Sequence, residues 1–184
     1  MKITIFSALL GMAMVSSASA GVFAASNPEA KAAYTQAKDR ADADYKAART
    51  RCDAITGNPK DVCIAEAKAA RVRTQEEAGA LYKNTLKSYT ASRMKIADAN
   101  YDLDKVKCAA LTGNDKDVCV QQAKATLVSA QADAKADRKA IEARTDARDD
   151  KRTAEYKVAL EKCDAFAGAV KNNCVATAKA QYGK

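Results

Sequence analysis

The sequence contains no histidine and no tryptophan, and its 184 residues include only two prolines and three phenylalanines. Without histidine, neither a Ser-His-Asp nor a Cys-His catalytic arrangement can form, and no glycine-rich phosphate-binding motif occurs. The carboxylates lie in Ala/Lys/Asp-rich stretches that are typical of exposed helix faces. We therefore predict no catalytic residues and no cofactor, and we expect that the protein is not an enzyme.

Large apolar side chains are scarce, so the material for a hydrophobic core is limited. Alanine accounts for 43 residues, and it buries little area on folding. Alanine is also the strongest helix former, with Lys, Arg, Glu and Gln close behind it. The net charge is +8, but acids and bases alternate along most of the chain, a pattern typical of solvated helix faces. These features predict long helices with a thin core.

The N-terminal stretch MKITIFSALLGMAMVSSASA has one lysine, an apolar run and small residues at Ala18-Ser19-Ala20. This layout is typical of a secretory signal peptide, so we predict a signal peptide at 1–20, with cleavage after Ala20 or after Ala24, and a short flexible N-terminus at 21–27. The apolar run is too short to span a bilayer. We expect an exported protein, periplasmic or secreted, that does not span the membrane and does not bind nucleic acid.

The six cysteines occur in three copies of one pattern, CDAITGNPKDVC from Cys52, CAALTGNDKDVC from Cys108 and CDAFAGAVKNNC from Cys163. A tyrosine stands seven positions before each first cysteine, and a large apolar residue stands three positions after it. This spacing predicts one helical stripe in each repeat. The three stripes are Tyr45, Cys52 and Ile55; Tyr101, Cys108 and Leu111; and Tyr156, Cys163 and Phe166. A fixed period of this length indicates a repeat architecture. We assign repeat units to 42–69, 98–125 and 153–180 of a single domain, 28–184.

Each copy of the pattern predicts a turn between two antiparallel helices. Gly57 and Gly113 suit the left-handed backbone position just past a helix end, where a side chain would clash. Asn58 and Asn114 are then expected to be the N-caps of the following helices. The third turn, at Gly168, lacks the asparagine, so we expect it to be looser.

Two cysteines placed symmetrically about such a turn face each other at a separation that a disulfide can bridge. An oxidising compartment would allow the bonds to form, so we predict the pairs Cys52–Cys63, Cys108–Cys119 and Cys163–Cys174. A zinc site would need short paired spacings or histidines, and a redox-active pair would normally be C-x-x-C. We expect no metal site.

The spacing predicts helices over 28–56, 59–111, 115–166 and 170–182, and the two central ones would each be about 75 Å long. Asn84-Thr85 is the most favourable point for an interruption of the first central helix. The predicted fold class is all-α, with elongated antiparallel hairpins or an incomplete helical bundle, very long helices of coiled-coil character, and hairpin corners closed by disulfides. Full folding back of the hairpins would give an incomplete four-helix bundle, and otherwise the helices form an open, elongated array.

One segment, residues 78–97, carries bases and no acid: Lys83, Lys87, Arg93 and Lys95. Apolar residues are interleaved with these bases, as in an amphipathic helix that binds anionic lipid or glycan. The alternative interpretation is that the apolar residues pack on a neighbouring helix while the bases face water. Both interpretations remain open from the sequence.

The cysteine-turn repeat, of the form CDxxxGNxKDxC, resembles a family of small Ala- and Lys-rich exported proteins of Gram-negative bacteria. Such proteins are often labelled TolA-like because their helices are similar in composition to the helical spacer of TolA. The resemblance covers roughly 42–182 and implies a periplasmic address, without the energy-transducing role of TolA.

We therefore expect a non-enzymatic periplasmic helical-repeat protein that acts as an envelope interaction or spacer element. The alternatives are a cationic binder of anionic envelope polymers or lipids, and a holdase-like periplasmic chaperone. The expected partner is an envelope protein or an anionic envelope surface, and the sequence does not specify the oligomeric state.

Overall fold

The computed structural model describes residues 28–184, and the predicted signal peptide and the segment 21–27 lie outside this range. The described chain is all-α, as the sequence predicts. Its helices are α1 (Pro28–Cys52), α2 (Asn58–Lys83), α3 (Leu86–Cys108), α4 (Gly113–Cys163) and α5 (Gly168–Tyr182). Each helix is rich in Ala, Lys, Asp or Glu, residues that favour helices or solvate their faces. None of these helices is both long enough and apolar enough to cross a membrane.

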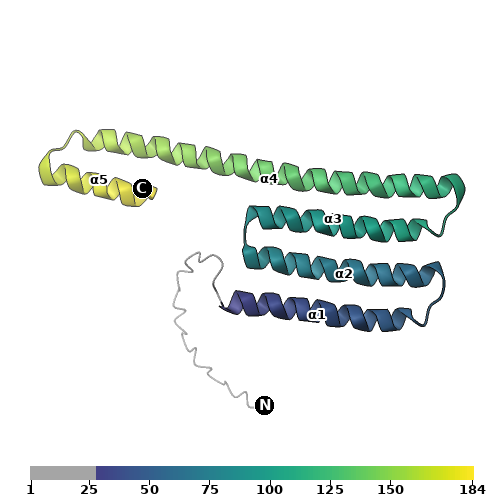
Figure 1. Cartoon of the computed structure of the whole chain (residues 1–184). Helices are drawn as coiled ribbons and strands as arrows, with labels where there is room; N and C mark the ends of the chain where they lie inside the picture. The colour runs from purple at the N-terminus through teal and green to yellow at the C-terminus, as the bar shows by residue number, and fades with distance from the viewer. Residues whose placement is uncertain (1–27) are drawn as a thin grey trace, which may run out of the picture.

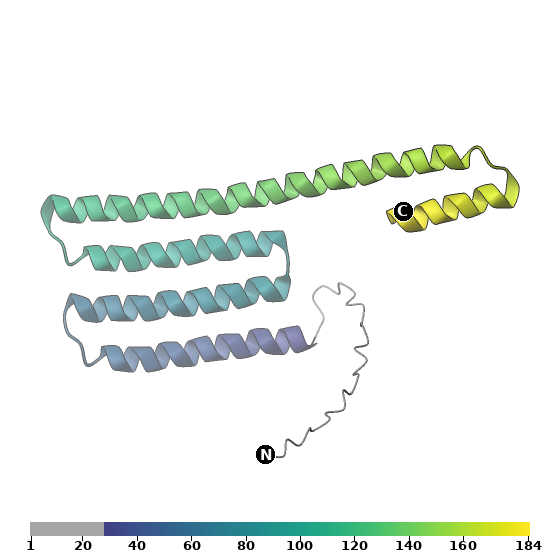
Figure 2. The same cartoon turned by 180° about the vertical axis from the view of Figure 1, so that it is seen from behind.

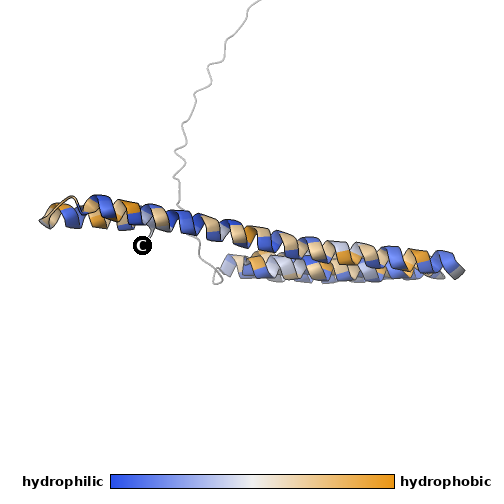
Figure 3. Ribbon diagram, turned by 90° about the horizontal axis from the view of Figure 1, so that it is seen from above, coloured by the Kyte–Doolittle hydropathy of each residue, from blue (hydrophilic) through white to orange (hydrophobic). Residues whose placement is uncertain are grey.

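The helices form a single layer. Each described helix contacts only the helix before it and the helix after it in the chain. Helices α1, α2, α3 and the first half of α4 lie side by side with alternating direction (Figure 1), and the view from behind shows the same order (Figure 2). Seen from above, the layer is thin and its helices alternate hydrophilic and hydrophobic residues (Figure 3). The structure is thus the open, elongated array and not the four-helix bundle.

The interruption predicted at Asn84-Thr85 is confirmed, and it is a full reversal of the chain, so the segment 59–111 forms the two helices α2 and α3 and not one. Asn84 has a left-handed backbone (φ 45°, ψ 45°), which ends α2. The Thr85 hydroxyl then accepts a hydrogen bond from the Ser88 backbone N–H (3.0 Å), while the Ser88 hydroxyl accepts one from the Thr85 N–H (3.2 Å). This reciprocal capping box starts α3 and makes the turn a helix–helix corner that has no disulfide.

Helix α4 is continuous over 51 residues, so the second predicted long helix is confirmed. Its first half packs against α3 and its last turns pack against α5, which folds back along it. Helices α3 and α5 lie on the same side of α4 (Figure 1). The opposite edge of α4 has no neighbour within the described chain.

The core consists of alanine and cysteine. Among the described residues, the buried apolar ones are Ala41, Cys52, Ala69, Ala80, Ala97, Cys108, Ala123, Ala134, Cys163 and Ala178. Several of them are 11 positions apart, as in Ala69 and Ala80, and 11 residues make three helical turns that return to the same side. Small side chains on these sides let neighbouring helices approach closely, so a thin layer needs few large residues.

The three cysteine pairs are disulfides, as the spacing predicts, and each closes one corner. The Cα–Cα separations are 5.7 Å for Cys52–Cys63, 5.7 Å for Cys108–Cys119 and 5.6 Å for Cys163–Cys174. The glycine of each turn has a positive φ, at Gly57, Gly113 and Gly168. The third turn is therefore not looser than the others, because its glycine and its disulfide have the same geometry and the Lys171–Asp164 ion pair (2.9 Å) also spans it.

The helices end at the first cysteine of each pair, earlier than predicted. The large apolar residue three positions on lies in the turn, where its backbone N–H donates to the cysteine carbonyl. Ile55, Leu111 and Phe166 are exposed there, so the prediction that they share a helical stripe with the cysteine is wrong. Their N–H···O=C distances are 3.0, 3.1 and 3.1 Å.

The predicted N-caps at Asn58 and Asn114 are also wrong. Helix α2 begins at Asn58 itself, with Gly57 as N-cap, and α4 begins at Gly113, with Thr112 as N-cap. The Asn58 side chain instead donates from Nδ2 to the backbone carbonyl of Val106 in α3 (2.9 Å). Because the disulfide and the glycine already fix the turn, this amide is free to join two helices.

Candidate functional site

The basic segment 78–97 is folded across the α2–α3 turn and is not one amphipathic helix. Lys83 is the last residue of α2, and Lys87 lies in the first turn of α3. The segment therefore presents its bases at a corner of the layer and along α3, and not on one face of a single helix.

The structure separates the four candidate anion-binding residues into two pairs. Arg93 Nη1 lies 2.7 Å from Asp137 Oδ2 of α4, and Lys95 Nζ lies 2.8 Å from Glu76 Oε1 of α2. These two bases therefore tie α3 to its neighbours. Lys83 and Lys87 are exposed and have no ion-pair partner among residues 28–184, so they are the two that remain open to an external anion.

The apolar residues of the same segment divide in a similar way. Tyr82 stacks on Tyr34 of α1, with ring centroids 5.2 Å apart. Leu81 is 67 % exposed and Tyr89 is 37 % exposed, so both face solvent near the turn. The corner thus offers two lysines beside two accessible apolar side chains.

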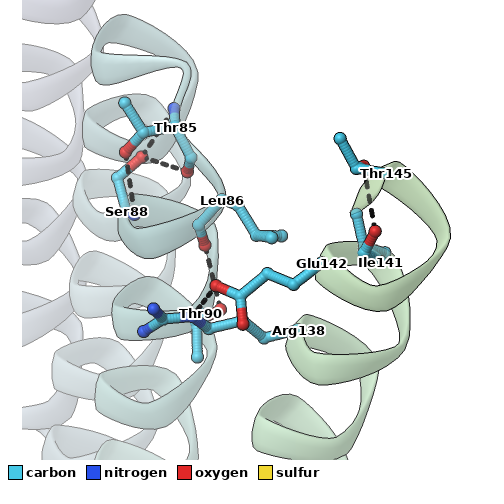
Figure 4. A network of polar contacts seen from close by, with 8 residues as sticks. All are labelled: Thr85, Leu86, Ser88, Thr90, Arg138, Ile141, Glu142 and Thr145. Carbon is cyan, nitrogen blue, oxygen red and sulfur yellow. Dashed lines mark hydrogen bonds and ion pairs between the residues drawn. The ribbon is translucent and has the colours of Figure 1, made fainter. Parts of the chain in front are cut away.

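Figure 4 shows the polar contacts within this corner and those within the facing part of α4. The Thr90 hydroxyl donates to the carbonyl of Leu86 one turn earlier (2.9 Å), and the Leu86 side chain points toward α4. On α4, Arg138 Nε donates to Glu142 Oε1 (2.7 Å), which neutralises both charges close to the corner. These hydrogen bonds are local to α3 or to α4, and the corner is closed without a covalent link.

Helices α2 and α3 also border a groove of about 830 Å³. Its apolar floor includes Ile64, Val72, Leu103 and Val106, and charged side chains line its rim. Rim residue Lys105 donates to Asp102 (2.9 Å), and this hydrogen bond raises the pKa of Lys105. The groove could hold an apolar side chain between charged walls, and no nucleophile–base pair lines it.

The sequence analysis missed a pair of polar contacts that recurs in two hairpins. Gln75 donates to Asp42 across α1 and α2 (2.8 Å), and Gln131 donates to Asp98 across α3 and α4 (2.7 Å). Both members of the second pair stand 56 positions after those of the first. The signal that could have identified them is the repeat period itself, extended beyond the cysteine-turn units.

In the part of the chain that the structure describes, no three His, Cys, Asp or Glu side chains gather in a way that could hold a metal ion. No protein-family model matches the chain, and no curated protein or solved structure is similar to it. The resemblance to the exported Ala- and Lys-rich family therefore stays a prediction that depends on the cysteine-turn motif.

Proposed function

We propose that this protein is a non-enzymatic periplasmic spacer or interaction element of the bacterial cell envelope. The observation that carries the proposal is helix α4, which runs without a break for 51 residues between two disulfide-closed corners. At 1.5 Å per residue it spans about 75 Å. A folded element of that length holds the groups at its two ends apart, which is the property a spacer needs.

The polar and covalent ties of the layer support the same role. Disulfides hold three corners, and the Gln–Asp contacts and the Arg93–Asp137 ion pair join neighbouring helices along their length. A layer that depends on covalent corners and small interlocking residues resists local opening better than its thin core alone would allow.

Small-angle X-ray scattering of the oxidised chain without residues 1–20 tests this proposal. We expect a maximum dimension of at least about 75 Å, since α4 alone requires it. A compact domain of this size would have a radius of gyration near 15 Å. A measured radius of gyration close to that value would show that α4 is not extended in solution and would rule out the spacer role.

A second candidate function, binding of anionic envelope polymers or lipids, is favoured by the exposed corner with Lys83 and Lys87. The net charge of +8 would steer the chain toward such a surface. Co-sedimentation with purified outer membrane and peptidoglycan, at low and at high salt, separates the candidates. Binding that disappears at high salt supports the cationic binder, and binding that survives salt supports a protein partner.

The charge-reversal variant Lys83→Glu/Lys87→Glu locates the anion site. Its matched control is Lys46→Glu/Lys124→Glu, in the middle of α1 and the first half of α4, which changes the net charge equally at exposed residues away from the corner. We expect only the first variant to lose salt-sensitive binding. Equal losses would show that binding depends on total charge and not on this corner.

A further inference from the structure

The edge of α2 that packs on α3 is the best-defined helix–helix contact surface between two repeats. Asn58 donates to Val106, the Ser88 hydroxyl donates to the carbonyl of Ala80 (3.3 Å), and Ala80 is buried. Ala69 lies three turns before Ala80 on the same side and is buried as well. This edge is therefore built for close packing of another helix.

The same residues recur on α4, where nothing covers them. Asn58, Val62, Ala69, Val72 and Ala80 of α2 are repeated 56 positions later as Asn114, Val118, Ala125, Val128 and Ala136. Ala125 and Ala136 are exposed, as are Val118 (59 %) and Val128 (57 %). They lie on the edge of α4 opposite α3, because Ala123 and Ala134 occupy the side that faces α3.

The second half of α4 carries the complementary surface on the same edge. On α3, Ser88 bonds to α2, the buried Ser92 lies one turn later on the same side, and Leu103 lines the α2–α3 groove. The residues 55 positions later are Ala143, Ala147 and Val158. Ala143 and Ala147 are exposed, and Val158 is 54 % exposed although it also borders the groove between α4 and α5. One open edge of α4 therefore carries two surfaces in succession. Its first half resembles the surface of α2 that meets α3, and its second half resembles the surface of α3 that meets α2.

We propose that this edge of α4 binds the same edge of a second copy of the chain, in an antiparallel dimer with a two-fold axis near Lys139–Ala140. The first half of each α4 would then cover the second half of the other, which repeats the α2–α3 contact twice between the copies. Lys139 and Ala140 stand 55 positions after Asn84 and Thr85, where α2 turns back into α3. Because α4 does not turn back at this point, its two halves cannot pack on each other and can make this contact only with another molecule.

Charge complementarity supports the antiparallel arrangement. Lys135 and Asp146 stand at similar distances on opposite sides of the proposed axis and on the same flank of the edge, so each would meet its opposite in the partner. Asp115 and Lys162 are placed in the same way farther out on the other flank. All four are exposed and have no ion-pair partner among residues 28–184.

Sedimentation equilibrium of the oxidised chain without residues 1–20 tests the proposal at micromolar concentration. We expect twice the monomer mass for the natural sequence, and a dissociation constant raised at least 100-fold by Ala125→Glu/Ala136→Glu. Circular dichroism checks that this variant keeps its helix content. A natural chain that is monomeric at these concentrations overturns the proposal.

The matched control is Ala43→Glu/Ala47→Glu on the outer edge of α1, which is exposed and corresponds in the repeat to Ala99 and Leu103 of α3. We expect it to dimerise normally. If this control breaks association instead, α1 of one copy meets α4 of another head to tail, and the two-fold dimer is wrong.

Lysine-directed cross-linking of a mixture of ¹⁴N- and ¹⁵N-labelled chains gives an independent measurement. Lys139 lies beside the proposed axis, so we expect an intermolecular Lys139–Lys139 link. Intermolecular links between Lys135 and lysines of α1 would contradict the two-fold arrangement.

The dimer and the spacer role can be tested separately. The scattering test of the spacer role can be made on the monomeric Ala125→Glu/Ala136→Glu variant, so a failure of the dimer proposal is distinguishable from a failure of the spacer proposal.

Discussion

Two equivalent points of the repeat behave in opposite ways. At Asn84–Thr85 the chain reverses and forms a corner, whereas at Lys139–Ala140, the corresponding positions, α4 continues straight. The flanking residues are otherwise similar, since Leu86 corresponds to Ile141 and Ala80 to Ala136. The difference lies in a left-handed Asn and in a Thr/Ser capping box, and α4 has neither.

This comparison teaches that two or three polar residues decide whether a repeat stacks on its predecessor or extends away from it. Lysine and alanine favour the helix interior, so the second point stays helical. Asparagine tolerates the left-handed backbone, and the Thr85 hydroxyl satisfies a backbone N–H of the next helix. The following substitutions test this explanation in order of expected effect.

Ile141→Pro should have the largest effect. Proline in a helix interior removes a backbone hydrogen bond and clashes with the preceding turn, which costs about 3 kcal/mol or more. Leu86→Pro is the matched change, because Leu86 is the first residue of α3 and Thr85 already has the extended backbone (φ −123°, ψ 147°) preferred before proline. Urea denaturation should show a much smaller loss for Leu86→Pro, and equal losses would contradict the comparison.

Removal of the last disulfide by Cys163→Ala/Cys174→Ala should come next. Helix α5 packs only against α4, whereas the disulfide-free α2–α3 corner belongs to helices with two neighbours each. A closed loop of this length contributes roughly 2–3 kcal/mol. Hydrogen exchange should accelerate throughout α5 and remain slow in α2 and α3. Unchanged protection of α5 would show that its packing on α4 is sufficient.

Thr85→Ala should destabilise the corner by roughly 1 kcal/mol, because the hydroxyl that caps α3 is lost. Thr126→Ala is the control, since Thr126 is exposed within α4 and its hydroxyl only donates to the carbonyl of Gln122 (3.1 Å). Thermal denaturation of the two variants measures the difference. A control that loses as much stability as Thr85→Ala would argue against the capping box as the cause.

Glycine at the two equivalent points should give the smallest effects, of different size. Lys139→Gly places glycine in a helix interior, at a cost of up to about 1 kcal/mol. Asn84→Gly should change stability by only a few tenths of a kcal/mol, because glycine adopts the left-handed backbone without strain. Circular dichroism during thermal unfolding compares the two. If Asn84→Gly proves the more harmful, the Asn84 side chain matters more than its backbone.

Some of the fold was predictable because local chemistry determines it. Two cysteines placed symmetrically about a turn glycine are each other's nearest possible partner. The disulfide pairing could therefore be predicted from the spacing alone. The single layer did not follow, because alanine occupies every side of these helices and no stripe indicates which side is covered. The cap at Asn58 was mispredicted because its partner, Val106, lies 48 positions away. The two surfaces of α4 required the repeat to be compared residue by residue with a structure.

The alanine and half-cystine core has a calorimetric consequence. Unfolding exposes little apolar area, and apolar exposure is what makes the heat capacity rise. We therefore expect a heat-capacity increment below the usual 12–15 cal/mol/K per residue. A small increment flattens the dependence of stability on temperature. The layer should then keep most of its modest stability through both warming and chilling of the cell, instead of having one narrow optimum.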